Sequence, residues 1–340
     1  MKTIKLTTWN IEHLDKLSGT TLNTNQIRRR DGIREEILTI SPDILCVVEG
    51  PNSEAKIDAV CTQLFNNEYV AIKAQNNDYG ILGNQWIWFL VKSDFPYLAS
   101  ARLLPTQTWY DYTGGKNWSV NFWGNFEAKS HYHYRQPQVL ILDIEGQQVE
   151  FIGAHLKSKF VNQGQSMWKD PARKQEFIQK SLEARIKMAT EAVNIRQYIN
   201  KRFTQNTKPA IFILGDFNDG PGKEYFENQY LFFDLISNIQ GDIFSAHKFL
   251  NHALFDYAAD LRWTVNFKDF VEPQRPPQIL LDHILFTQAL VNHHLKITVL
   301  PNAGLVEHEV HDFVNSRLNS NQKTSDHKPV SVHLTINDGQ

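Results

Sequence analysis

Two short segments join an apolar strand pattern to polar groups that could act on a phosphoester. Residues 213–219 read Ile-Leu-Gly-Asp-Phe-Asn-Asp, and residues 324–330 read Thr-Ser-Asp-His-Lys-Pro-Val. A rigid strand can hold carboxylate, amide and imidazole groups at its end and aim them into a cleft. The two segments together predict a metal-assisted phosphoester hydrolase.

Four further segments have the same form, a strand pattern that leads into polar residues. They are residues 8–12 (Thr-Trp-Asn-Ile-Glu), 42–49 (Pro-Asp-Ile-Leu-Cys-Val-Val-Glu), 153–159 (Gly-Ala-His-Leu-Lys-Ser-Lys) and 281–286 (Leu-Asp-His-Ile-Leu-Phe). In this order the six segments resemble the endonuclease/exonuclease/phosphatase superfamily. Its members include pancreatic-type deoxyribonucleases, abasic-site endonucleases, tyrosyl-DNA phosphodiesterases, inositol polyphosphate phosphatases and neutral sphingomyelinases. The resemblance extends from about residue 6 to about residue 334.

The composition predicts one globular domain over residues 1–340. The chain is 41% hydrophobic and has no linker-like or low-complexity run. No stretch approaches the roughly 18 apolar residues of a membrane span, so we expect no membrane partner. A strand pattern begins almost at Met1, which leaves no room for a secretory signal and favours the cytoplasm. Cys46 and Cys61 lie in apolar patterns and are expected to be buried free thiols.

The order of elements predicts an α/β fold. Strand patterns lie near residues 4–10, 43–48, 86–92, 138–144, 149–154, 210–214, 280–286, 295–300 and 329–335. Between them, helical patterns run to about residue 40, from Ser53 as N-cap to about Phe65, and from Pro171 to about Phe203. This alternation suits two mixed β-sheets packed together with helices outside. The resemblance implies the same four-layer α/β/β/α sandwich.

Hard oxygen ligands in these segments predict a Mg²⁺ or Mn²⁺ site. Phosphoester hydrolysis needs a cation that neutralises phosphate charge, and carboxylates favour Mg²⁺ or Mn²⁺ over zinc. Glu49 ends a buried strand pattern and is the expected principal ligand, as the resemblance also implies. The resemblance implies Glu12 and Asp326 as further residues of the metal site. The family often has Asp where this chain has Glu12, which leaves open whether Glu12 binds directly or through water.

The resemblance implies roles for the catalytic groups. Asp216 is then the carboxylate that activates water, and Asn218 contacts the phosphate or the metal shell. These two residues share one side of an extended segment by its two-residue period. Asn10 would bind the phosphate or orient Glu49.

Two histidines complete the catalytic set that the resemblance implies. His155 would donate to a phosphoryl oxygen. His327 would be a second donor or an acid/base group, oriented by Asp282. A carboxylate behind an imidazole fixes its tautomer and raises its pKa.

Basic and aromatic residues could bind substrate. Lys157 and Lys159 lie on one side of an extended segment and could hold flanking phosphates as point charges. Arg135 matches a recurring position before a proline and could face the site. An aromatic-rich insertion at about residues 105–135 includes Trp109, Trp118 and Trp123, which could stack on unpaired bases or could instead be core residues.

We expect a divalent-metal-dependent nuclease or DNA-end phosphodiesterase, with DNA favoured over RNA and a monomer by default. The net charge of −2 and the pI near 6.7 do not by themselves indicate a nucleic-acid binder. They keep open a second interpretation, a phosphatase or phosphodiesterase for a small or lipid phosphoester such as an inositol phosphate or sphingomyelin. A non-catalytic binding module would be expected to have lost an acid. Glu49, Asp216 and Asp282 are all present.

Overall fold

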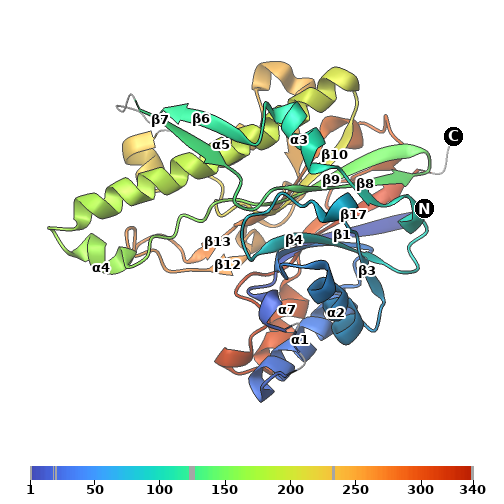
Figure 1. Ribbon diagram of the computed structural model, residues 1–340, viewed down its shortest axis with the longest axis horizontal. Helices are drawn as coiled ribbons and strands as arrows, with labels where there is room; N and C mark the ends of the chain where they lie inside the picture. The colour runs from blue at the N-terminus through green and yellow to red at the C-terminus, as the bar shows by residue number, and fades with distance from the viewer. Residues whose placement is uncertain (1, 18, 20, 122–126, 232–233, 338–340) are drawn as a thin grey trace.

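Two β-sheets stack face to face at the centre of the protein, with helices on both outer faces (Figure 1). The computed structural model describes residues 2–17, 19, 21–121, 127–231 and 234–337. α1, α2 and α7 cover one sheet, whereas α3, α5 and α6 cover the other. The predicted four-layer α/β/β/α sandwich is therefore confirmed.

The first sheet joins the two ends of the chain. Within the described residues it has seven strands, and β1 (Lys2–Asn10) lies between the antiparallel β17 (Val330–Ile336) and the parallel β2 (Ile44–Gly50). The order continues outward through β4 (Trp86–Lys92) to β3 (Tyr69–Ala71), and β15 (Ile297–Thr298) and β16 (Gly304–Val306) both pair with β17. Residues at the carboxyl ends of β1 and β2 therefore meet at one edge.

The second sheet has the same kind of centre, a parallel strand pair. Its six strands, counted over the described residues, are ordered β11 (Leu250–His252), β14 (Asp282–Thr287), β10 (Ala210–Asp216), β9 (Gln147–His155), β8 (Gln138–Ile144) and β5 (Arg102–Leu103). β9 and β10 are parallel, and β10 is antiparallel to β14. A tight hairpin turn joins β8 to β9, with Glu145 and Gly146 both at positive φ.

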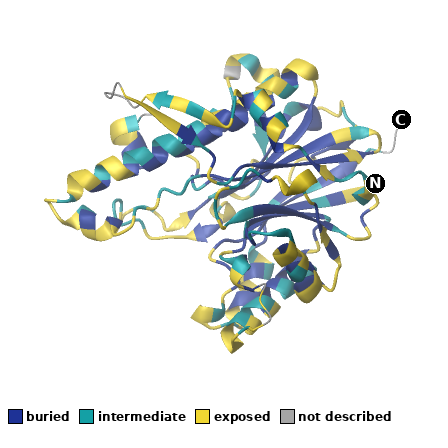
Figure 2. Ribbon diagram, in the orientation of Figure 1, coloured by how far each residue is buried: buried dark blue, intermediate teal, exposed yellow. Residues whose placement is uncertain are grey.

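The main hydrophobic core fills the space between the sheets, where the strands of both are buried (Figure 2). Cys46 and Phe89 of the first sheet belong to the same buried cluster as Phe151 and Phe212 of the second. Gly153 lies where the sheets approach closely, since a Cβ there would come within 2.9 Å of Cys46 Sγ. Both cysteines are buried and free, as predicted.

The helices follow the predicted pattern with one shifted start. Ser53 caps α2 (Glu54–Phe65) by accepting from the Lys56 amide, as expected. The long helix α5 runs over Lys174–Gln205 and begins three residues later than predicted, because Asp170 accepts the Ala172 amide and holds a turn there. The other α-helices are α1 (Thr24–Ile40), α3 (Thr106–Thr113), α4 (Gly164–Lys169), α6 (Leu235–Gln240) and α7 (His308–Ser316).

An arm projects from one end of the sandwich (Figure 1). It contains α4, the first half of α5 and the hairpin of β12 (Val265–Asn266) and β13 (Gln278–Ile279). Met167, Phe177 and Phe226 form a small core of its own. A second hairpin, β6 (Asn117–Asn121) with β7 (Ala128–Tyr132), lies along α5. Across the described chain, none of the helices combines the length and apolar character that a membrane crossing requires.

Candidate active site

Three of the predicted catalytic residues are direct neighbours across the second sheet. Asp216, the last residue of β10, pairs in register with His155 of β9 and with Asp282 of β14. Gly215 makes this approach possible: its φ is +141°, and a Cβ there would overlap the Ala154 carbonyl. Strand register therefore places two carboxylates and an imidazole side by side.

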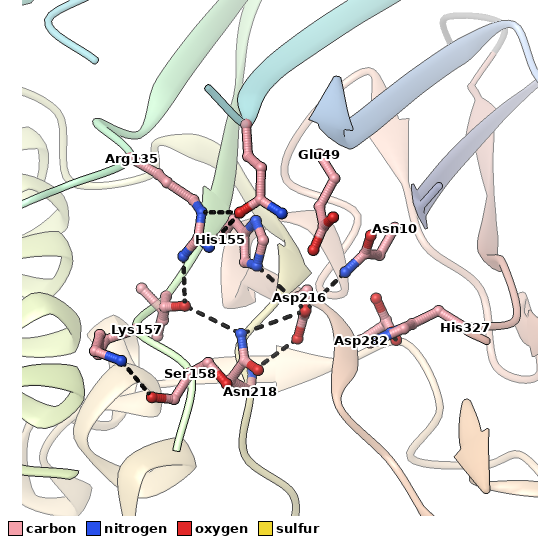
Figure 3. Close-up of polar contacts among 12 residues, drawn as sticks. Asn10, Glu49, Arg135, His155, Lys157, Ser158, Asp216, Asn218, Asp282 and His327 are labelled. Carbon is pink, nitrogen blue, oxygen red and sulfur yellow. Dashed lines mark hydrogen bonds and ion pairs between the residues drawn. The ribbon is translucent and has the colours of Figure 1, made fainter. Parts of the chain in front are cut away.

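Asp216 is held by donors from both sheets (Figure 3). Asn10, at the end of β1, donates from Nδ2 to Asp216 Oδ2 at 3.0 Å. The Asn218 backbone amide donates to Oδ1 at 2.8 Å, and Asn218 Nδ2 lies 3.3 Å from Oδ2. Burial raises the pKa of Asp216 even though these donors and His327 oppose the shift. A carboxylate tuned in this way is a stronger base than an exposed aspartate.

His155 borders Asp216 as a neutral ring. Its Nε2 lies 3.5 Å from Asp216 Oδ2, and burial lowers its pKa well below the ordinary histidine value, with further lowering by Arg135 and His327. His155 Nδ1 is buried and has no hydrogen-bond partner among the described residues.

His327, unlike His155, is held in its charged form. Its Nδ1 donates to Asp282 Oδ2 at 2.7 Å. Burial by itself would lower the pKa of His327, but Asp282 and Asp216 together raise it to about 10. The ring is therefore an imidazolium at neutral pH, able to donate from Nε2.

Hydrogen bonds to β1 hold the loop that carries His327 in place. The Trp9 indole donates to the His327 carbonyl at 2.8 Å, and Ser325 Oγ donates to the Asn10 carbonyl at 2.6 Å. Further back, Glu36 is fully buried and accepts from the Thr324 hydroxyl and from Asn315. Sequence reasoning missed this support, because Glu36 lies in α1 without any nearby motif.

The predicted metal ligands do not all reach the same place. Asn10, Glu49 and Asp326 line one cavity with Asp216 and His327, whereas Glu12 is exposed and does not line it. Glu49 takes a left-handed φ of 60° where β2 ends, and its Oε2 accepts the His13 amide at 3.2 Å.

The oxygen donors fit a hard divalent cation. Asn10 Oδ1 is buried and accepts no hydrogen bond from any described residue, which is unusual for a polar atom. It borders the same cavity as the Glu49 and Asp326 carboxylates. Asp216, Asp282 and His327 also bring one possible ligand atom each within 4.8 Å of one another, but Asp282 Oδ2 already holds His327. Glu49, Asp326 and Asn10 are thus the better candidates for Mg²⁺ or Mn²⁺.

The cavity has a volume of about 410 Å³. Besides the polar groups described above, its lining includes the charged residues Lys159, Arg185, Glu224 and Asp269. It also includes aromatic side chains, namely Phe160, Phe177, Phe226, Phe267 and Phe270. Phe160 and Phe267 are 75% and 54% exposed. Neither was predicted as a site residue, because a single phenylalanine in a loop has no sequence signal.

Arg135 lies at the site, as its predicted position requires. It lines the cavity, and its Nε donates to Gln85 Oε1 at 3.1 Å (Figure 3). Arg135 Nη1 is 3.5 Å from the Leu156 carbonyl. Gln85 was not predicted. It orients the guanidinium so that the group faces the cavity beside His155.

The two predicted phosphate lysines differ. Lys157 is half-buried, and its Nζ donates only to the Ser158 carbonyl at 2.8 Å among the described residues. Lys159 is engaged by acids, with ion pairs to Asp219 and to Glu224, the latter at 2.9 Å. Lys159 does line the catalytic cavity, but its charge is already matched by these acids, so the structure favours an ion-pair role for it over phosphate binding.

The aromatic insertion is largely structural. Trp109 is only 2% exposed, stacks on Tyr198 at 4.6 Å between ring centroids and donates to Asn194. Of the two alternatives left open by the sequence, the structure favours the core position, because the ring lies under α5 and is not free to stack on a base. Trp118 is partly exposed on β6, packs edge-on against His133 and does not line the catalytic cavity. Trp123 lies outside the described residues.

Comparison with solved structures agrees with this architecture. Truncated Caenorhabditis elegans TDP2 is similar with a TM-score of 0.52 and 14% identity, covering 98% of each chain. D. rerio TDP2, solved in complex with a single-strand DNA product, also has a TM-score of 0.52, with 13% identity over 99% of this chain and 100% of that one. An endonuclease/exonuclease/phosphatase from Beutenbergia cavernae has a TM-score of 0.49 and 14% identity, covering 99% of this chain and 72% of that one. No protein-family model and no curated protein matches the sequence significantly.

The chain therefore has the fold seen in these TDP2 structures. At identities this low the similarity shows the fold alone. The chemistry of this chain must be argued from its own residues.

Proposed function

We propose that this protein is a divalent-metal-dependent phosphodiester hydrolase acting on nucleic acid, as a nuclease or DNA-end phosphodiesterase. One observation carries the proposal: a buried carboxylate with a raised pKa and a buried imidazolium border one cavity. These are the two groups that phosphodiester hydrolysis asks of the protein, a base for water and a donor for developing negative charge.

Each residue then has a defined task. Asp216 accepts a proton from the attacking water, and Asn10 and Asn218 hold its carboxylate in place. The water oxygen forms the new bond to phosphorus while the bond to the leaving oxygen breaks. His327, charged and oriented by Asp282, donates to the phosphoryl or leaving oxygen. His155 and Arg135 border the same space and are proposed as further donors to phosphoryl oxygens.

The donor set supports a metal cofactor. Glu49, Asp326 and Asn10 would hold Mg²⁺ or Mn²⁺. The cation would neutralise phosphate charge and polarise the phosphoryl group.

The five phenylalanines in the cavity lining favour a second candidate, a phosphodiesterase for a lipid or another apolar phosphoester. One panel separates the two candidates. Hydrolysis of single-stranded DNA, duplex DNA, abasic DNA, RNA, bis-p-nitrophenyl phosphate, inositol phosphates and sphingomyelin vesicles would be measured with Mg²⁺ or Mn²⁺. Cleavage of nucleic acid supports the first candidate. Cleavage of sphingomyelin or inositol phosphate alone would replace it with the second, and cleavage of none of them would end both.

A further inference from the structure

A second cavity adjoins the catalytic one and is lined by lysines. It has a volume of about 440 Å³, and the two cavities share Phe160 and Val161 as a common wall. Its basic residues are Lys129, Lys157, Lys180 and Lys187. The second cavity, called the lysine groove below, lies on the other side of Phe160 from Asp216 and His327.

Two of these lysines, Lys157 and Lys187, make no direct ion pair within the described residues. Lys129 is paired with Glu183 at 3.2 Å, and Lys180 with Glu176 at 2.6 Å. Within the described chain, no carboxylate lies within ion-pair distance of Lys157 Nζ or Lys187 Nζ.

The ammonium groups of Lys157 and Lys187 are held in place. Lys187 Nζ lies over the Tyr132 ring at 4.5 Å, and Lys157 Nζ donates to the Ser158 carbonyl. Burial lowers the pKa of Lys157, and the charges of Arg135 and Lys187 lower it further, while Glu191 opposes them. The one acid that acts on both lysines is the buried Glu191, which accepts the Lys157 amide and whose pKa burial raises to about 7. Two cations with so little opposing charge form a site for an anion.

Phe160 lines both cavities and could contact a ligand that reaches from the lysine groove into the catalytic cavity. Its ring is 75% exposed although it stands between two cavities, and so it offers a flat apolar face to a ligand. In single-stranded nucleic acids a base lies between successive phosphates, and bases stack on such rings whatever their sequence.

We propose that the substrate is a single-stranded polynucleotide that spans both cavities. An unpaired base stacks on Phe160, and the phosphate that flanks the scissile one binds Lys157 and Lys187 in the lysine groove. This inference rests on the proposed function and narrows its substrate class. In this arrangement Lys187, and not Lys159 as the sequence suggested, binds the flanking phosphate together with Lys157.

Binding and turnover test the inference separately. Binding of a fluorescein-labelled ten-nucleotide oligodeoxythymidine would be followed by anisotropy in an Asp216→Asn background with Mg²⁺, at several salt concentrations. Turnover by the otherwise wild-type chain would be measured as kcat/KM on the same oligonucleotide and on bis-p-nitrophenyl phosphate. The test variants are Phe160→Ala and Lys187→Ala. The matched controls are Phe244→Ala, a phenylalanine that is 96% exposed and lines neither cavity, and Lys201→Ala, an exposed lysine further along α5.

We expect Phe160→Ala to weaken oligonucleotide binding about fivefold or more. Lys187→Ala should weaken binding and reduce the slope of log affinity against log salt by about 0.7. Both variants should lower the ratio of oligonucleotide to small-diester kcat/KM, whereas the two controls should leave the ratio unchanged.

If both test variants keep the wild-type affinity and the wild-type dependence of affinity on salt, the inference is overturned and the proposed function is not. Equal losses on both substrates, or cleavage of sphingomyelin vesicles in preference to any oligonucleotide, would overturn the inference as well. Because anisotropy needs no turnover, absence of hydrolysis on every substrate would instead overturn the proposed function.

Discussion

Asp282 and His327 come from opposite sheets and meet through a 2.7 Å hydrogen bond between Asp282 Oδ2 and His327 Nδ1. Asp282 begins β14 of the second sheet, and His327 lies just before β17 of the first. The charge on His327 therefore depends on how the two sheets pack. A change at that interface would reach the site through this bond.

The pH dependence of turnover follows from the same bond. His327 has its pKa raised to about 10 and is expected to act as a donor, so rate should fall as pH rises through that value. His327→Ala should cost at least about a hundredfold in kcat. Asp282→Asn removes the negative charge and should move the alkaline limb of the kcat profile to lower pH. If that limb stays in place, the two residues are not coupled.

Stability should depend on the same proton. The folded pKa of His327 lies above the ordinary value of 6.5, so its stabilising contribution is complete below pH 6.5 and is lost as pH rises through about 10. Over that window the wild type should lose up to about 1.4 kcal/mol per pH unit more unfolding free energy than His327→Gln. Urea denaturation of both proteins from pH 6 to 10 measures the difference. Parallel curves would show that His327 takes up no extra proton on folding.

Metal removal should abolish activity. EDTA is expected to stop hydrolysis, and Mg²⁺ or Mn²⁺ to restore it, because the donor set consists of hard oxygens. Glu49→Gln should lower metal-dependent kcat by at least about a hundredfold. Glu12→Gln is the control and should have a smaller effect, since Glu12 is exposed and does not line the cavity. Full activity after metal stripping, or a Glu49→Gln rate near wild type, would place the chemistry elsewhere.

Trp109 should matter for stability alone. Its ring is stacked on Tyr198 in the core, so Trp109→Ala should reduce the unfolding free energy by about 3–5 kcal/mol. Partly exposed Trp118 should cost less when changed to alanine. Chemical denaturation gives both values, and a selective loss of oligonucleotide turnover in a stably folded Trp109→Ala protein would restore a substrate role.

Lys159 should behave as an interior ion-pair partner. Lys159→Met leaves Asp219 and Glu224 without this cation, and breaking a buried pair costs about 3–5 kcal/mol. Lys73→Met, which breaks an exposed pair with Asp58, should cost under about 1 kcal/mol. Thermal or urea unfolding distinguishes them, and equal small losses would mean that the arm does not need Lys159.

Much of the scaffold could be predicted because its strands are continuous apolar runs that end in polar residues. The strands that end at His155 and at Asp216 were placed correctly on this basis, and so was the strand that begins at Asp282. Their register could not be predicted. A pattern along one strand does not say which residue of the next strand stands beside it, so the direct pairing of Asp216 with His155 and Asp282 came only from the structure.

Lys159 and Trp109 are less available to a substrate than the sequence suggested, and for the same reason. Lys159 looked available because the acids that surround it, Glu224 and Glu227, lie more than sixty residues later in the chain. Trp109 looked available because its segment resembles an exposed loop in composition, but it forms α3 and packs under α5. Long-range burial decides whether a charged or aromatic group can reach a ligand, and local sequence contains little of that information.

The pairing of β1 with β17 has a consequence for the protein during its synthesis. The Trp9 indole, made near the start, binds the carbonyl of His327, made 318 positions later. While a ribosome is still adding the second half, the nascent chain has Asn10 and Glu49 but lacks the imidazolium and the strand that seats it. A site built in this order is not assembled until β17 has emerged, so the proposed chemistry has to wait until nearly the whole chain has been synthesised.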